Sequence, residues 1–260
     1  DLGFDSLPAA DDPRLLPLQT LEGPPSALAS VRAAMRRGGR GERLRMSFYG
    51  ASHTAGDWWT GRIRRVLQER WGDAGHGFVL PAALYRGYRG SDVNLCRTEG
   101  WYGDWAGRKG GRDDGFLGPG GMSVSSSNPE DFGWIQTTVD NPQGRRVGAF
   151  EVFALGQPEG GSLAFVVDDA SAQTLPPRAP EPMLLRARIE VPDGPHRLAL
   201  APAGDGEVRI FGVSMERPGP GVIVDAIGIR GRQAKTWLRW DEEMAGQGIA
   251  ALAPDLIVLA

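Results

Sequence analysis

The sequence predicts an α/β domain that is interrupted by an inserted antiparallel β module. Leu44–Gly50 has the pattern of a short strand that leads into a tight turn and a helix, and Gly221–Ile227 is an almost continuous apolar run, typical of a strand covered on both faces. The stretch between them changes to short alternating runs separated by turn residues, which is typical of a β-sandwich or jelly roll. The α/β domain is therefore expected to be built from two separate parts of the chain.

The composition argues against several classes of protein. Hydrophobic residues make up 41% and charged residues 23% of the 260 residues, as in ordinary soluble globular proteins. The net charge of −3 provides no basic field for nucleic acid, and no apolar run is long enough for a membrane span. Cys96 is the single cysteine, so it forms no intrachain disulfide, and we expect a small buried side chain. Lysine occurs only at Lys109 and Lys235, and the other cations are arginines.

The first part of the α/β domain is predicted to contain a helix, a strand and a second helix. Asp1–Pro25 is rich in proline and has no clear period, so we expect an extended arm. Ser26–Arg37 has a capping serine and a shared apolar face, which predict a helix. Leu44–Phe48 alternates apolar and polar residues, as a strand does. Asp57 is expected to cap the helix that ends at Trp71.

Turn residues divide the inserted module into short strands. The expected strands are Gly121–Ser126, Gly133–Val139, Arg146–Ala154, Ser162–Val167, Leu184–Val191, His196–Ala201 and Val208–Ser214. After the module and the strand Gly221–Ile227, we expect a helix over Gln233–Met244 and a second buried strand over Pro254–Ala260. These patterns predict four segments: an arm (1–25), the first part of the α/β domain (26–88), the inserted β-sandwich (89–217) and the second part of the α/β domain (218–260).

Ser52 is the strongest candidate for a catalytic residue, because it lies in the turn between a strand and a helix. Open α/β folds place their sites at the carboxyl ends of the strands, so the hydroxyl would be presented there. The backbone N–H of Ser52 would lie near the positive end of a helix, where it can face a developing oxyanion. The sequence thus predicts a nucleophile and one oxyanion donor at a single position.

The run Gly50-Ala51-Ser52-His53-Thr54-Ala55-Gly56-Asp57, followed by Trp58-Trp59-Thr60-Gly61-Arg62, resembles the first sequence block of the SGNH (GDSL-type) hydrolases. The resemblance is closest to the subgroup that includes peptidoglycan O-acetylesterases. It implies a flavodoxin-like, three-layer α/β/α domain with Ser52 as the nucleophile, and an inserted carbohydrate-binding-like β-sandwich. The chain departs from the family at Ala51, where the family has an aspartate that helps to hold the turn.

Asp225-Ala226-Ile227-Gly228-Ile229-Arg230-Gly231 resembles the second block of the same family. By this resemblance Gly231 supplies the second oxyanion N–H, although a plain turn after a strand also uses glycine. The family's later blocks, an Asn and an Asp-x-x-His that supplies the base, do not follow Pro254–Ala260. The resemblance therefore implies that the α/β domain is incomplete at its C-terminus here, and that residues outside this chain, such as a second polypeptide, supply the missing groups.

Other candidate site residues have structural alternatives. Trp101, Trp105 and Trp134, with Tyr102, are candidates for stacking on sugar rings, and packing in the core is the alternative that we favour. His53 lies beside the nucleophile, and His76 is expected to form a hydrogen bond in a loop. Acidic pairs such as Asp113-Asp114 and Asp168-Asp169 are more typical of turns and solvated faces than of calcium sites, so no metal is expected.

The favoured hypothesis is a serine esterase that removes O-acetyl groups from a carbohydrate, such as peptidoglycan, without a metal or organic cofactor. Two alternatives stay open: a noncatalytic glycan-binding or scaffold protein (or an inactive fragment), and an esterase or lipase for small acyl esters. The chain begins at Asp1 rather than Met, which fits a removed signal peptide as well as an engineered start. With a bacterial cell-wall substrate in view, we expect a periplasmic or secreted location.

Overall fold

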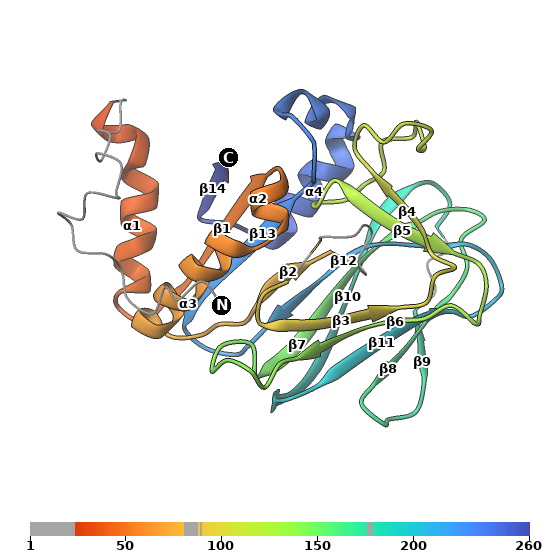
Figure 1. The fold of residues 1–260 in the computed structure, drawn as a ribbon, viewed down its shortest axis with the longest axis horizontal. Coiled ribbons are helices and arrows are strands. Elements are labelled where there is room, and N and C mark those ends of the chain that lie inside the picture. Colours follow the sequence, from red (N-terminus) through yellow and green to blue (C-terminus); the bar gives the residue numbers. More distant parts are fainter. Residues whose placement is uncertain (1–23, 81–87, 89, 176–178) are drawn as a thin grey trace.

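A computed structural model describes residues 24–80, 88, 90–175 and 179–260 (Figure 1). Most of the predicted arm, 1–25, lies outside the described residues. The first predicted helix begins as a short 3₁₀ helix, η1 (Pro25–Leu28), and continues as α1 (Ala29–Gly38). Ser26 lies inside η1 and does not cap it, because Pro24 is the residue at the cap position and Pro25 fixes the first turn.

A parallel sheet forms the α/β part of the molecule (Figure 1). Its strands lie in the order β13 (Gly221–Gly228), β1 (Arg43–Gly50) and β14 (Leu256–Leu259). The helices α1 and α3 (Trp58–Trp71) cover one face of it. The buried side chains between them are Ala34, Leu44, Met46, Phe48, Val222 and Val224, against which Trp59, Ile63, Leu67 and Trp71 pack. The alternation seen in the sequence of β1 thus selects the residues that face the helices.

The strand β14 was expected to be buried, and this expectation is wrong. Within the described residues β14 pairs only with β1, so it forms an edge of the sheet. Its side chains alternate between partly buried and exposed, with Ile257 44% and Leu259 65% exposed. The apolar run therefore forms a half-covered edge strand, which is a surface that usually receives another element.

Two antiparallel sheets follow β1 and precede β13 in the chain. One has the order β10 (Met183–Gly194), β7 (Val147–Gly156), β12 (Val208–Glu216), β5 (Met122–Ser126) and β4 (Tyr102–Trp105), with β2 (Gly77–Val79) also paired to β12. The other has the order β3 (Val93–Arg97), β6 (Gly133–Thr137), β11 (Arg197–Pro202), β8 (Leu163–Val167) and β9 (Gln173–Leu175). Side chains of both sheets, such as Val124, Ile135, Leu200 and Ile210, share one buried core.

The seven strands expected in this stretch are all present, with their ends either unchanged or shifted by up to three residues. The strands β2, β3, β4 and β9 were not predicted, because they are only three to five residues long and contain glycine or polar residues. Cys96 was expected to be buried but is exposed. It lies on β3, where Val93 and Leu95 turn inward and the side chains between and after them turn outward.

The segment after β13 does not form the single helix that was expected over Gln233–Met244. It forms a 3₁₀ helix, η2 (Ala234–Arg239), and then a separate α-helix, α4 (Glu242–Leu252). The break occurs at Asp241, whose carboxylate accepts a hydrogen bond from the Met244 N–H (2.8 Å) and caps α4. The sequence carried this signal, because an aspartate followed by two glutamates is typical of a helix start.

Candidate active site

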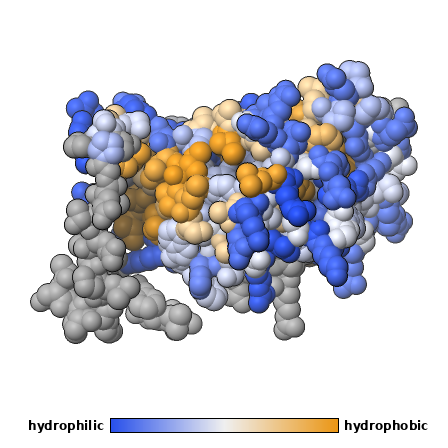
Figure 2. Space-filling model, turned by 90° about the horizontal axis from the view of Figure 1, so that it is seen from above, coloured by the Kyte–Doolittle hydropathy of each residue, from blue (hydrophilic) through white to orange (hydrophobic). Residues whose placement is uncertain are grey.

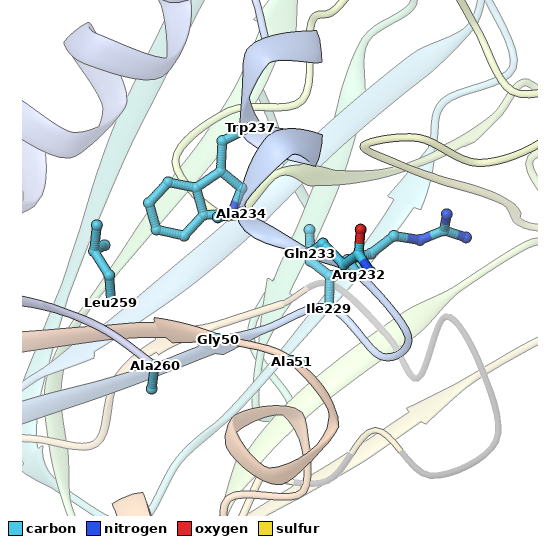
Figure 3. Close-up of a pocket in the computed structure, with 9 residues that line it drawn as sticks. All are labelled: Gly50, Ala51, Ile229, Arg232, Gln233, Ala234, Trp237, Leu259 and Ala260. Atoms are coloured by element: carbon cyan, nitrogen blue, oxygen red, sulfur yellow. The ribbon is translucent and has the colours of Figure 1, made fainter.

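The carboxyl ends of β1, β13 and β14 meet at one edge of the parallel sheet and border a cavity of about 170 Å³ (Figure 3). In Figure 3 Trp237 and Leu259 lie on one side of this cavity, and the Arg232 side chain points away from Trp237. The cavity is lined by Gly50, Ala51, Ile229, Arg232, Gln233, Ala234, Trp237, Leu259 and Ala260. It thus lies where open α/β folds place their sites. Ala51 lines the cavity, whereas the predicted nucleophile Ser52, the next residue in the chain, does not.

Two glycines allow the backbone to turn tightly at this edge. Gly50 and Gly228 are opposite each other in the paired strands β1 and β13. A Cβ on Gly50 would lie 2.3 Å from Thr54 Oγ1, and a Cβ on Gly228 would lie 2.1 Å from the backbone nitrogen of Ala55. The short helix α2 (Ser52–Ala55) can therefore lie against the strand ends only because both positions lack a side chain.

Ser52 is the first residue of α2, and its side chain is exposed. Its hydroxyl forms no hydrogen bond with any residue of the described ranges. Ala51, at the cap position, has no side-chain group that could bind the free N–H groups of the helix. The hydroxyl and these N–H groups therefore lie at the same edge of the sheet, at the N-terminus of α2. Its catalytic role stays a prediction.

Asp57 fixes the far end of the turn, but not as the helix cap that was expected. It has a left-handed backbone (φ 52°) and forms no capping hydrogen bond. Its buried carboxylate instead forms an ion pair with Arg64 (Oδ2–Nη1, 2.8 Å) and accepts hydrogen bonds from Thr60 Oγ1 and the Ser91 N–H. Burial opposes its ionisation, but the charge and hydrogen bonds of Arg64 outweigh this and hold the pKa of Asp57 below its usual value.

Gly231 follows β13 at the same edge, two residues beyond Ile229, which lines the cavity. It is exposed and has a left-handed backbone (φ 71°), which explains why glycine is suitable there. Gly231 is not among the residues that line the cavity. Its role as an oxyanion donor therefore stays a prediction.

The three histidines do not supply a partner for Ser52 within the described residues. His53 is exposed on α2. His76 is buried, and its Nε2 donates to the Ser91 carbonyl (2.7 Å). This agrees with the expectation that His76 forms a hydrogen bond in a loop. His196 binds Asp168 through Nδ1 and the Pro192 carbonyl through Nε2, both at 2.7 Å, so its ring nitrogens are engaged. The base expected of a serine hydrolase is thus not provided by these side chains.

The predicted sugar-stacking residues do not form one surface. Trp101 is only 5% exposed and belongs to the core between the two antiparallel sheets, so it cannot stack on a sugar ring at the surface. Trp134 is half-buried and lines the same interior region. Trp105 is half-buried, and the Arg108 guanidinium lies over its ring (4.9 Å). The alternative of structural packing is correct for Trp101, because its side chain is part of this buried core.

The cavity residues Arg232, Gln233 and Trp237 were not identified from the sequence. Trp237 packs edge-on against Tyr49 of β1 (5.3 Å between ring centroids), so η2 folds back over the strand ends. The signal that pointed to them was their place directly after a buried parallel strand, where loops at the carboxyl edge carry site residues.

No group of three or more acidic, histidine or cysteine side chains that could hold a metal occurs in the described part of the chain. Asp114, one of the candidate calcium residues, forms an ion pair with the buried Arg209 instead, and Asp168 binds His196. Among the described helices, none is both long and apolar enough to cross a membrane.

Comparisons with known proteins identify the fold. No protein-family model and no curated protein matches the sequence. A solved structure described as a peptidoglycan O-acetylesterase in action is similar, with a TM-score of 0.67 and 24% identity over 91% of this chain and 61% of that one. The chain thus spans less than two-thirds of that protein, and the two share a mixed α/β fold with several sheets.

Two further solved structures are much less similar. A family two carbohydrate esterase from Cellvibrio japonicus has a TM-score of 0.27 and 10% identity, with 64% of this chain and 51% of that one covered. A β-1,3-glucan-binding CBM6 module from Bacillus halodurans has a TM-score of 0.30 and 11% identity, with 49% and 97% covered. Neither likeness is close enough to carry an argument about this chain.

Proposed function

We propose that the chain is part of a serine esterase of the SGNH type that removes O-acetyl groups from a carbohydrate. The observation that carries the proposal is the exposed, unpartnered hydroxyl of Ser52 at the start of α2, beside a cavity at the carboxyl edge of a parallel sheet. The likeness in fold to a peptidoglycan O-acetylesterase supports it and makes peptidoglycan the first substrate to test. Such a substrate would place the protein in the periplasm or outside the cell.

The proposed reaction has two steps. Ser52 Oγ attacks the acetyl carbonyl carbon while a base takes its proton, and the oxyanion is held by the N–H groups of Ser52 and Gly231. The sugar oxygen leaves with the proton, and an acetyl-serine remains. Water then attacks the acetyl-serine, which releases acetate and restores the serine. The inserted β-sandwich would shape the cleft or bind the glycan.

The base and the family's asparagine are proposed to come from residues outside this sequence. Two observations support this part of the proposal. The edge strand β14 exposes Ile257 and Leu259, so it offers an apolar edge that another element can cover. The chain also spans only 61% of the similar solved structure. Native and then denaturing mass spectrometry of the protein from its natural source tests whether another polypeptide accompanies it.

The decisive test compares acetate release from O-acetylated peptidoglycan by the natural protein, by Ser52→Ala and by Ser171→Ala. Ser171 is an exposed serine outside the site, so it is a matched control. We expect Ser52→Ala to abolish release and Ser171→Ala to keep it. Release that persists in Ser52→Ala would remove the serine from the mechanism.

A noncatalytic glycan-binding protein is the second candidate function. Ala51 in place of the family's aspartate and the lack of a base beside Ser52 in the described residues favour it. It predicts binding to the glycan with no acetate release by the natural protein. Faster hydrolysis of p-nitrophenyl acetate than of acetylated glycan would instead favour an esterase for small acyl esters.

A further inference from the structure

A second and larger hollow adjoins the proposed active site. It lies between the loop after β4 (106–115) and the segment after β13 (232–241), and has a volume of about 660 Å³. We call it the basic groove, because its ionisable lining residues are Arg108, Lys109, Arg232, Lys235, Arg239 and the single acid Asp113. Arg232 lines both the groove and the active-site cavity, so the two hollows are neighbours on either side of this residue.

The five cations of the basic groove are not neutralised by the protein. Within the described residues none of them forms an ion pair, whereas buried arginines elsewhere, such as Arg64 and Arg209, are paired with aspartates. Two further acids close to the groove in the chain are engaged elsewhere, because Asp114 pairs with Arg209 and Asp241 caps α4, which leaves Asp113 as the one acid in its lining. The groove also holds both lysines of the chain. In a protein with a net charge of −3, this is a local concentration of positive charge.

The walls of the basic groove are fixed in position. Arg232 Nη1 donates to the Gly107 carbonyl (2.8 Å), while its buried Nε has no hydrogen-bond partner. A Cβ on Gly107 would lie 2.7 Å from Thr236 Cγ2, so the loop and η2 are in close contact. The Arg108 guanidinium lies over the rings of Tyr102 (4.4 Å) and Trp105 (4.9 Å). These contacts orient the guanidinium groups but leave their charge free for a ligand.

The basic groove and the active-site cavity lie next to each other, since Arg232 lines both. Figure 2 views the molecule from above and shows a hydrophobic area left of centre, at the position of β14 in Figure 1, with mainly hydrophilic surface to its right. A chain-like ligand that fills both hollows would therefore contact apolar surface at the cavity and cations beyond it.

We propose that the basic groove binds the anionic groups, carboxylate or phosphate, of an acidic glycan whose acetyl ester is presented to Ser52. This inference rests on the proposed esterase function and specifies its substrate class. Guanidinium and ammonium groups are the natural partners of carboxylate and phosphate oxygens. An acidic glycan fits better than nucleic acid, because the groove lies next to an apolar cavity and the protein as a whole carries a net charge of −3.

The test measures binding separately from catalysis. A fluorescent oligogalacturonate, which carries carboxylates and no ester, is titrated with the natural protein, and a neutral galacto-oligosaccharide of the same length is the comparison. We expect the acidic probe to bind at least about tenfold more tightly at low salt and to lose this advantage as salt screens the charges. Competition by inorganic phosphate against acetate identifies which anion the groove prefers. Equal binding of the two oligosaccharides would overturn the proposal.

Charge-removing variants locate the binding. Lys109→Gln/Lys235→Gln removes two exposed cations of the groove, and Arg36→Gln/Arg40→Gln removes two exposed cations near α1 as a matched control. We expect the first pair to weaken binding of the acidic probe about tenfold and the control to change it less than about twofold. An equal loss in both would overturn the proposal, and so would tighter binding of a single-stranded DNA oligonucleotide than of the acidic probe.

Failure of the groove proposal can be distinguished from failure of the proposed esterase function. Hydrolysis of p-nitrophenyl acetate, which has no anionic group to bind, should be unchanged in Lys109→Gln/Lys235→Gln, while acetate release from an acidic acetylated glycan should fall. If no ester is hydrolysed by any form but the groove variants still lose binding, the esterase proposal fails. The basic groove then remains a binding site for acidic glycans.

Discussion

Arg45 of β1 and Asp225 of β13 form a buried, two-pronged ion pair between neighbouring parallel strands. Arg45 Nε donates to Asp225 Oδ2 (2.9 Å) and Nη2 donates to Oδ1 (2.8 Å). Arg45 Nη1 also donates to Glu216 of β12 (2.9 Å), and Asp225 accepts the Phe78 N–H of β2 (2.7 Å). The pair therefore joins the parallel sheet to the neighbouring antiparallel sheet, behind the strand ends that carry the proposed site.

Replacing Asp225 by asparagine should destabilise the protein strongly. Burial opposes ionisation of Asp225, but Arg45 and the hydrogen bonds from Ser47 and Phe78 outweigh it and hold its pKa below the usual value. Asp225→Asn leaves the buried Arg45 undercompensated, so we expect the free energy of unfolding to fall by about 3 kcal/mol in urea titrations. Glu190→Gln, which removes one of the two carboxylate partners of the exposed Arg188, should change it by less than about 1 kcal/mol. Similar losses in both variants would contradict this account.

Gly228→Ala should disturb the turn that presents Ser52. The new Cβ would lie 2.1 Å from the backbone nitrogen of Ala55, and backbone cannot move aside as a flexible side chain can. We expect a loss of about 2–3 kcal/mol in the free energy of unfolding. Gly246→Ala, inside α4 where nothing lies within 4 Å, should instead stabilise the protein by about 1 kcal/mol. Urea unfolding titrations measure whether the first variant is destabilised and the second is stabilised.

Ala51→Asp should stabilise the turn at the proposed nucleophile. Ala51 is the cap residue of α2 and offers no acceptor, whereas an aspartate there can accept a hydrogen bond from the free N–H groups. We expect a gain of about 0.5–1 kcal/mol in thermal or urea unfolding. Ala51→Asn provides the hydrogen-bond acceptor without the negative charge, and it should give a similar gain in stability. If both variants lower the stability, the cavity beside Ala51 does not accept a larger side chain.

His76 should make stability depend on pH between 6.5 and 4. Burial, aided by the charge of Arg64, lowers the pKa of His76 to about 4, while the unfolded chain has the usual value of about 6.5. Above pH 6.5 the ring is neutral in both states. As the pH falls from 6.5 to 4 only the unfolded state gains the proton, so about 3 kcal/mol of stability is lost.

The measurement is urea unfolding of the natural protein and His76→Gln at pH 7, 6 and 5. The variant should lack the part of the pH slope that comes from this ring, about 1.4 kcal/mol per pH unit. His53→Gln, at an exposed position, is the control and should keep the natural slope. A slope unchanged in His76→Gln would show that the ring is accessible to protons in the folded protein.

Much of the local structure could be predicted from the sequence. The strands β1 and β13 follow from their apolar pattern, and the turn at Ser52 follows from the position of Gly50 between a strand pattern and a helix start. The short strands β2 and β9 could not be predicted, because three residues carry no period of their own. The break at Asp241 was visible in principle, since an aspartate and two glutamates mark a helix start.

The sequence by itself determined where the chain becomes strand, turn or helix around Ser52, because these choices depend on neighbouring residues. Only the tertiary structure decided which polar groups are buried and which apolar ones are exposed. Arg45 binds Asp225, which lies 180 residues away along the chain. The Asp57 carboxylate forms an ion pair with Arg64 and does not cap the helix that it precedes. Leu259 stays exposed because no described strand pairs with the outer edge of β14. Burial depends on partners that are distant in sequence, and a local sequence pattern contains no information about them.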